Sequence, residues 1–463
     1  MRVSAPAHTQ TPSDESVAVA GRLVAVVDRT LPYLGPMLAG VLGLVALGRR
    51  ALVVDEATLL TAAQGSFSEV VDRAISDDPA RVGYLALLQP VARHGDSELW
   101  LRLPSVLAGI VAAVAVYLLG RRLAGRYAGA AASLVLATSV GVVSLTRSVG
   151  PLAFALAAML VSSALFARSV DRGNAFWWAL YALSAVLLPL THPIAVSALA
   201  AHLVAAAFAW RQLDLRLALP ALAIAVVECG LLLGAAALDR ADALDGAGPL
   251  ELGDVGAGIG RALAWSPAVA GLAIWGIVSL YRGSTVGTGR WKAALVAGLA
   301  VMPLVFVLAA GVVVPVYPRA ALTVAAGGLA LGAGIGLVAI TDRGVRLAAG
   351  TGLAVVAVAA LATAAARDQP ENWRAAAQLV RANASAKDTV VVLPQRARAA
   401  FSYYAPELRL TTVGRGDAVF VVIAGDSGQA TASGRQVVSP PRYALLSEEH
   451  AGDDLVVQRW IRP

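Results

Sequence analysis

Long apolar segments recur along almost the whole of this chain, and they constrain its fold more than any motif does. Of its 463 residues 58% are hydrophobic and only 14% charged, with a mean hydropathy of +0.70. A soluble core of this length would not bury so much apolar surface. The sequence therefore predicts a polytopic membrane protein.

The number of transmembrane helices follows from the spacing of the apolar segments. A helix needs roughly 20 apolar residues to cross a bilayer, because lipid offers no partner to an unpaired backbone group. Eleven segments approach this length. They lie at about 33–48, 100–120, 127–146, 151–168, 175–191, 193–210, 216–238, 262–281, 293–316, 320–340 and 346–366. We predict an α-helical polytopic protein with about eleven transmembrane helices over 33–367.

Positive charges in the short loops orient these helices. If the N-terminus is cytoplasmic, the inner loops carry Arg121, Arg122, Arg126, Arg168, Arg172, Arg211, Arg216, Arg282, Arg290, Lys292, Arg343 and Arg346. Such an excess is typical of cytoplasmic loops, although Arg49 and Arg50 run against it. We expect residues 1–32 to form a cytoplasmic tail and the C-terminus to lie outside the plasma membrane. Topology explains much of the formal charge of +7, so no nucleic-acid partner is predicted.

The composition changes after Arg367. Residues 368–463 combine a helical stretch at 371–382 with short β-like runs at 389–393, 418–424 and 455–460. These runs are too short to span a bilayer and too apolar for a disordered tail, so they predict a small extracytoplasmic α/β domain. The sole cysteine, Cys229, lies in a predicted span and leaves no intrachain disulfide to form.

The first external loop, 51–99, contains the most informative residues. An adjacent pair of carboxylates, Asp55 and Glu56, follows the first apolar segment, and Arg102-Leu103-Pro104-Ser105 opens the second. An Asp-Glu pair, a short surface helix and an Arg-Leu-Pro-Ser segment in this order resemble the C-superfamily glycosyltransferases. The resemblance is to the protein-mannosyltransferase and aminoarabinose-transferase-like families of bacteria.

Later motifs extend the resemblance. Thr191-His192-Pro193 is similar to a histidine-proline turn of the family, and Tyr317-Pro318-Arg319 to its late Tyr/Arg motif. Asn372-Trp373-Arg374 resembles the start of the external domain in actinobacterial members. Two positions depart from the family. Ala80-Arg81 replaces a Pro-Pro, with Tyr84 retained, and Gly150-Pro151-Leu152 replaces an Arg-Pro-Tyr, with Arg147 the nearest arginine.

The resemblance implies transfer of a sugar from a polyprenyl-phosphate-linked donor to an extracytoplasmic protein, lipid or cell-wall glycan. It favours Asp55 as the general base, with Glu56 as its catalytic partner. The implied substrate contacts are Tyr84, Arg102, Arg147, His192, Tyr317 and Arg319. A carboxylate can take the proton of an acceptor hydroxyl, and cations can stabilise the departing phosphate. No certain cofactor is implied. Mg²⁺ or Mn²⁺ could join carboxylates and phosphates there, but no all-protein ligand set is present.

Other interpretations of these residues stay open. Asp55 and Glu56 also suit the N-terminus of a surface helix over 56–66, where negative charge is favourable. Arg102 and Arg319 could anchor span ends in lipid headgroups, and His192 could be a hydrogen-bonded structural residue. The chain could be a catalytically silent relative that binds a lipid-linked sugar or a partner enzyme. A transporter of a lipid intermediate is the third candidate.

Overall fold

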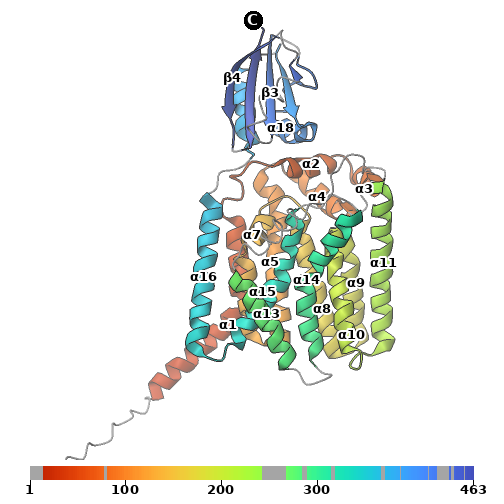
Figure 1. Cartoon of the computed structure of the whole chain (residues 1–463), viewed down its shortest axis with the longest axis vertical. Coiled ribbons are helices and arrows are strands. Elements are labelled where there is room, and N and C mark those ends of the chain that lie inside the picture. The colour runs from red at the N-terminus through yellow and green to blue at the C-terminus, as the bar shows by residue number, and fades with distance from the viewer. Residues whose placement is uncertain are drawn as a thin grey trace, which may run out of the picture.

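A helical bundle with a small domain above one end makes up the protein (Figure 1). The computed structural model describes residues 14–77, 81–241, 267–283, 289–313, 319–366, 371–385, 387–414, 417–424, 437–438, 443–452 and 454–462. The face of the bundle nearest this domain is called the domain side below.

Each predicted membrane segment overlaps a helix or two consecutive helices. The bundle elements are α1 (Asp14–Leu44), α5 (Glu98–Ala124), α6 (Arg126–Ala137), α7 (Val140–Thr146), α8 (Leu152–Arg172), α9 (Ala175–Thr191), η2 (Pro193–Val196), α10 (Ser197–Ala209), α11 (Leu215–Ala241), α13 (Pro267–Arg282), α14 (Arg290–Val313), η3 (Arg319–Ala325), α15 (Ala326–Ala339) and α16 (Arg343–Ala366). Within the described residues, five helices are individually long and apolar enough to cross a membrane. The prediction of a polytopic helical membrane fold is confirmed.

Helices α6 and α7 form a bent pair that could make a sixth span. Their axes differ by 68° across a break at Thr138 and Ser139. The Ser139 hydroxyl accepts a hydrogen bond from the Val142 N–H at 3.1 Å, so it caps the start of α7. A serine at this position lets the chain begin a new helix in a new direction.

Small residues bring neighbouring helices of the bundle into close contact. A Cβ on Gly276 of α13 would lie 2.1 Å from the Gly332 carbonyl oxygen of α15, and one on Gly336 would lie 2.0 Å from the Leu272 oxygen. Only glycine fits at such distances, and small residues four apart are typical of membrane helix interfaces. Helix α16 is different, since none of its residues is buried.

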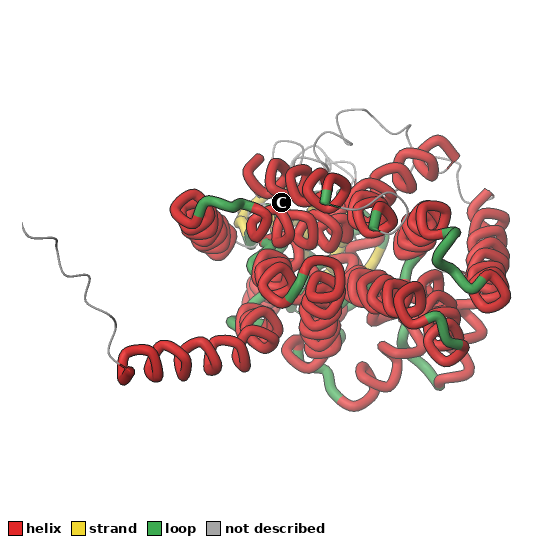
Figure 2. The backbone as a smooth tube through the Cα atoms, turned by 90° about the horizontal axis from the view of Figure 1, so that it is seen from below, coloured by secondary structure: helices red, strands yellow, loops and turns green. Residues whose placement is uncertain are grey.

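Helix α1 is longer than the apolar segment that predicted it. It begins at Asp14, inside the segment predicted as a cytoplasmic tail, and its first part runs out from the bundle (Figure 2). The cytoplasmic location of this part stays a prediction.

Three short helices lie across the domain side of the bundle (Figure 1). They are α2 (Val54–Ala62), α3 (Phe67–Asp77) and α4 (Val82–His94), and together they are called the loop layer. Leu60, Val70, Tyr84 and Leu88 give the layer an apolar core of its own. A Cβ on Gly83 would lie 2.4 Å from the Leu190 oxygen, so α4 packs directly on the end of α9. The predicted surface helix over 56–66 is present as α2.

The C-terminal domain is a five-stranded sheet with helices. Its elements are α17 (Trp373–Asn383), β1 (Thr389–Leu393), η4 (Gln395–Ala397), α18 (Arg398–Tyr404), β2 (Leu410–Thr411), β3 (Ala418–Ala424), β4 (Ala444–His450) and β5 (Leu455–Ile461). The strand order is β2-β1-β3-β5-β4, parallel from β2 to β3 and antiparallel from β3 to β4. The predicted helix and the three predicted strands are present. The sequence missed β2, which has two residues, and β4, which is exposed.

Candidate active site

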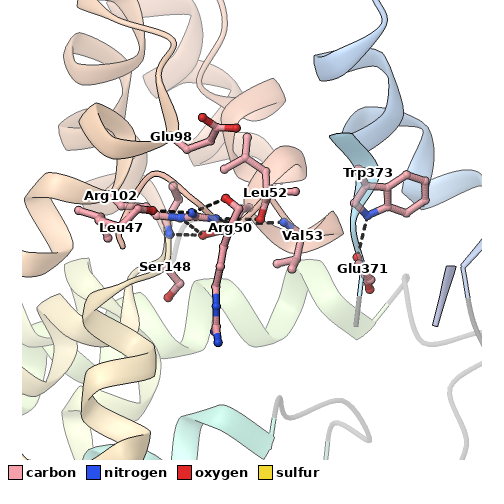
Figure 3. Close-up of polar contacts among 12 residues, drawn as sticks. Leu47, Arg50, Leu52, Val53, Glu98, Arg102, Ser148, Glu371 and Trp373 are labelled. Carbon is pink, nitrogen blue, oxygen red and sulfur yellow. Dashed lines mark hydrogen bonds and ion pairs between the residues drawn. The ribbon is translucent and has the colours of Figure 1, made fainter. Parts of the chain in front are cut away.

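A buried ion pair joins the two motifs that stood out in the sequence. Arg102 Nε donates to Glu56 Oε1 at 3.0 Å, and Arg102 Nη2 donates to Glu56 Oε2 at 2.6 Å (Figure 3). Both side chains are more than nine-tenths buried. The pair connects the first turn of α2 to the first turns of α5. Burying it is tolerable only because both groups are fully hydrogen-bonded.

Arg102 uses all of its donors within the protein. Beyond Glu56, its Nη1 donates to the carbonyl oxygens of Leu47 at 3.0 Å and Arg50 at 2.8 Å, and Nη2 donates to Ala51 at 3.0 Å. A guanidinium has five N–H groups, and these five bonds occupy them. Arg102 therefore holds the segment that leads into α2, and leaves no donor for a phosphate in this structure.

Glu56 is equally saturated. Its Oε2 accepts from the Val53 N–H at 3.1 Å, which caps α2, and its Oε1 accepts from the Val149 N–H at 2.7 Å. The second bond ties Glu56 to the segment after α7, where the sequence departs from the family pattern. Because each carboxylate oxygen already has two donors, Glu56 joins three parts of the chain: the start of α2, helix α5 and the segment after α7.

Asp55 differs from Glu56 in both its burial and its hydrogen bonding. It is exposed, and its carboxylate makes no hydrogen bond or ion pair with any residue that the structure describes. Its position in the first turn of α2 is fixed by the bonds of Glu56 one residue later. The adjacent pair thus divides into one carboxylate that is bonded on both oxygens and one that is exposed and has no partner among the described residues.

Two arginines near the ion pair have donors to spare. Arg147 follows the last residue of α7, and its Nε is buried without a hydrogen-bond partner in the described part of the chain. It lies close enough to Arg50 and Arg102 for their charges to repel its own. The Arg50 side chain points away from the ion pair (Figure 3), and its Nη2 reaches the Ala364 carbonyl of α16 at 3.4 Å. Cations so crowded favour an anion.

The other predicted contacts have different surroundings. Tyr84 is buried, with its ring centroid 5.6 Å from that of Phe154, and burial together with the charge of Glu56 raises the pKa of its hydroxyl. His192 Nδ1 accepts from the Ile194 N–H at 3.2 Å and so caps η2. Tyr317 and the side chain of Arg319 lie outside the described residues. Tyr84 therefore lies near Glu56. His192 instead forms a hydrogen bond within the turn that it caps, at the start of η2.

Arg50 was not predicted as a site residue, because its charge only ran against the predicted topology. The contacts between the C-terminal domain and the segment before Asp55 were not predicted either. Glu371, Arg374 and Tyr404 contact residues 48–54 or Glu98. Trp373-Arg374 and the aromatic pair Tyr403-Tyr404 were the signals in the sequence that fall on this contact. Among the described residues, no three His, Cys, Asp or Glu side chains gather into a group that could hold a metal ion.

Residues 84–232 match the model of the family described as dolichyl-phosphate-mannose-protein mannosyltransferase. No curated protein matches the chain significantly.

Several solved structures share the fold. ArnT from Cupriavidus metallidurans in the apo state has a TM-score of 0.60 at 14% identity, over 96% of this chain and 98% of ArnT. The same protein bound to undecaprenyl phosphate has a TM-score of 0.55 at 14% identity, over 92% and 97%. The Archaeoglobus fulgidus oligosaccharyltransferase complex with Zn and sulfate has a TM-score of 0.56 at 13% identity, over 88% of this chain and 70% of that one. The matched segment and the shared fold show a multi-pass membrane protein that has the fold of these glycosyltransferases.

Proposed function

We propose that the protein transfers a sugar from a polyprenyl-phosphate-linked donor to a hydroxyl of an acceptor outside the plasma membrane, with Asp55 as general base. The observation that carries this proposal is the contrast within one turn of α2. Glu56 is fully bonded and buried, while Asp55 is exposed and has no partner among the described residues, and Arg147, near Arg102, keeps a donor without a partner there.

The chemistry assigns separate work to the carboxylate and the cations. As the acceptor oxygen bonds to the anomeric carbon, its proton passes to the Asp55 carboxylate. The bond from that carbon to the phosphate oxygen breaks, and its electron pair leaves with the polyprenyl phosphate. Arg147 and Arg50 would stabilise the charge that the phosphate gains, because charge-assisted hydrogen bonds strengthen as that charge develops.

An apolar cavity gives the lipid tail of such a donor a place. It has a volume of about 450 Å³ and lies between α16 and the bundle, lined by Leu38, Thr138, Val140, Val269 and residues of α16 between Gly350 and Ala360. Two of its walls lead to the arginines. Helix α7 begins at Val140 and is followed by Arg147, and α16 continues to Ala364, whose carbonyl binds Arg50. A phosphate at the arginines would thus leave its tail in apolar surroundings.

The comparisons support a lipid-linked donor by analogy. The matching ArnT structure contains undecaprenyl phosphate, which is a polyprenyl phosphate. In the proposed reaction Glu56, Arg102 and Tyr84 shape the site, with Glu56 orienting α2 for its neighbour. His192, Tyr317 and Arg319 remain predicted substrate contacts. The proposed orientation places the N-terminus inside and the loop layer outside.

The test is turnover of polyprenyl-phosphate sugars by the full chain in lipid nanodiscs, with membrane extract as acceptor and released polyprenyl phosphate as the readout. General base catalysis contributes about 10²–10⁴-fold, so Asp55→Asn should lower release by that factor with unchanged thermal stability. Asp72→Asn, an exposed carboxylate on α3 of the same layer, is the matched control and should keep full activity.

Two results would count against the proposal. Equal release by wild type and Asp55→Asn would remove Asp55 from the reaction. Donor binding without release in both proteins would favour the catalytically silent relative.

A further inference from the structure

The segment between α1 and α2 depends on side chains from elsewhere for its hydrogen bonds. Residues 47–54 lead directly into Asp55, and residues 50–53 have no regular secondary structure. On the bundle side, Arg102 binds the carbonyl groups of Leu47, Arg50 and Ala51. Buried peptide groups without partners are costly, so the remaining groups of this segment need partners as well.

The C-terminal domain supplies those partners from the other side. The Leu52 N–H donates to the Tyr404 hydroxyl at 2.7 Å, and the Val54 N–H donates to Glu371 Oε2 at 3.1 Å. Arg374 adds longer contacts to the carbonyl oxygens of Gly48 and Arg49, at 3.5 and 3.4 Å. The segment is therefore held between Arg102 and three side chains that lie more than 300 residues further along the chain.

The same side chains also fix the start of α5. The Tyr404 hydroxyl donates to Glu98 Oε1 at 2.9 Å, and Arg374 forms an ion pair with the same carboxylate. Burial raises the pKa of Tyr404, so its hydroxyl stays protonated and can accept from Leu52 while it donates to Glu98. One phenol thus links the segment before Asp55 to the helix that carries Arg102.

Apolar packing joins α2 to the domain as well. Ala57 is 2% exposed and belongs to the same core as Trp373, Phe401 and Phe420 of the domain. Ala57 lies two residues after Asp55, and Val54, which Glu371 binds, lies one residue before it. Contacts from the domain therefore bracket the proposed base on both sides.

From these contacts we infer that the C-terminal domain is a working part of the active site, in which Glu371 and Tyr404 are positioning residues for Asp55. This inference rests on the proposed function. The domain binds the Leu52 and Val54 N–H groups before Asp55, while Arg102 binds carbonyl groups of the same segment and is paired with Glu56 in the turn that carries Asp55. Small misplacements of a catalytic group can lower a rate by about 10²-fold, so the loss of either bond should lower kcat.

The test compares Tyr404→Phe, Glu371→Ala and Glu371→Gln in the full chain in nanodiscs. Tyr404→Phe keeps the ring and removes only the hydroxyl. Glu371→Gln keeps a carbonyl oxygen that can accept from Val54, so it should recover much of what Glu371→Ala loses. The matched control is Glu407→Gln, which breaks the exposed Glu407–Arg381 pair of the same domain, and neither side chain of that pair bonds to residues 47–54 in the described part of the chain.

Two readouts separate positioning from folding and from the proposed function. Tyr404→Phe and Glu371→Ala should each lower kcat about 10- to 100-fold at unchanged donor KM. Amide hydrogen exchange at Leu52 and Val54 should speed up in these variants, while the strands of the domain stay protected. Glu407→Gln should change neither.

Every outcome decides something. Full kcat in both variants beside an active wild type would overturn the inference, as would faster exchange throughout the domain, because that would mean loss of folding. An inactive wild type with faster exchange confined to residues 52–56 would overturn the transferase proposal and support the contact itself.

Discussion

Two buried polar clusters in this protein differ in their charge and in the parts of the chain that they join. The cluster on the domain side centres on the Glu56–Arg102 ion pair, whose partners lie 46 and 93 residues from Glu56. The cluster inside the bundle centres on His202, which lies 2.9 Å from the Ser163 hydroxyl and 3.2 Å from that of Tyr181. The first cluster is charged and joins loops to helices, whereas the second joins three neighbouring helices.

The difference shows what each cluster is built to do. His202 also stacks on Phe166, with ring centroids 4.9 Å apart, and is completely buried. It satisfies its own hydrogen bonds and presents nothing to a ligand. The Glu56 cluster instead stops at an exposed carboxylate, Asp55, and at Arg147, whose Nε has no partner in the described residues. Closed polar clusters hold helices together, and an open one offers groups for chemistry.

The largest effect should come from breaking the ion pair of the open cluster. Glu56→Gln leaves the Arg102 charge buried without its counter-ion, which costs about 3–5 kcal/mol, and the variant should lose both stability and transfer. Thermal unfolding in detergent measures the first and donor turnover the second.

Glu69→Gln is the matched control for that variant. Glu69 Oε2 accepts the Ser66 N–H at 2.9 Å much as Glu56 accepts that of Val53, but Glu69 is exposed. Its loss should cost less than about 1 kcal/mol. An equal loss of stability in the two variants would show that helix capping by Glu56, and not its ion pair with Arg102, stabilises this region.

An effect of intermediate size should follow from replacing Arg147, whose Nε has no partner among the described residues. Arg147→Gln removes one charge from the proposed phosphate site. Hydrogen bonds to charged groups contribute about 1.5–3 kcal/mol, so donor affinity should fall roughly 10- to 150-fold with little change in stability. Binding of undecaprenyl phosphate to the nanodisc-embedded protein measures it.

Arg121→Gln tests whether position matters for that result. Arg121 lies in the last turn of α5, at the end of the helix opposite Arg102. Its removal should leave donor affinity unchanged. Similar losses for both arginines would mean that net charge alone attracts the lipid.

The smallest effect should come from the closed cluster. His202→Leu removes the hydrogen bonds to Ser163 and Tyr181, and hydrogen bonds between membrane helices contribute about 0.6–1.7 kcal/mol. The thermal unfolding temperature should fall modestly, and sugar transfer should persist. Tyr181→Phe removes one of the same bonds from the other partner and should resemble it. A loss of turnover at unchanged stability would give the bundle interior a part in the reaction.

The sequence was sufficient for the helices and most of the strands, because both depend on local patterns. Apolar length predicted the membrane segments, and short β-branched runs predicted β1, β3 and β5. It could not predict β4, whose Ser447-Glu448-Glu449 stretch has no buried residue to set an alternation. The bend between α6 and α7 was missed because Thr138 and Ser139 at the break are no more polar than Ser133 and Ser144, which lie inside the two helices.

The site was predicted by residue type but not by pairing. Asp55, Glu56 and Arg102 all stood out, yet no spacing in the chain indicates that Arg102 would use every donor on Glu56 and on carbonyl groups of the segment 47–51. Such pairing depends on which helices pack together. The contacts of Glu371 and Tyr404 could not be predicted either. More than 300 residues separate these side chains from their partners, so only the packing of the domain on the bundle brings them together.

The two outer strands of the C-terminal sheet have a consequence for how copies of the protein coexist. Proteins that share a membrane meet often, and an unpaired strand invites another sheet to add to it. Here β2 has only two residues, and β4 has an irregular register between Leu445 and Ser447 and carries Glu448 and Glu449. Short or bulged, charged strands pair poorly with a second sheet. The domain can therefore stand above a crowded bilayer without joining its neighbours.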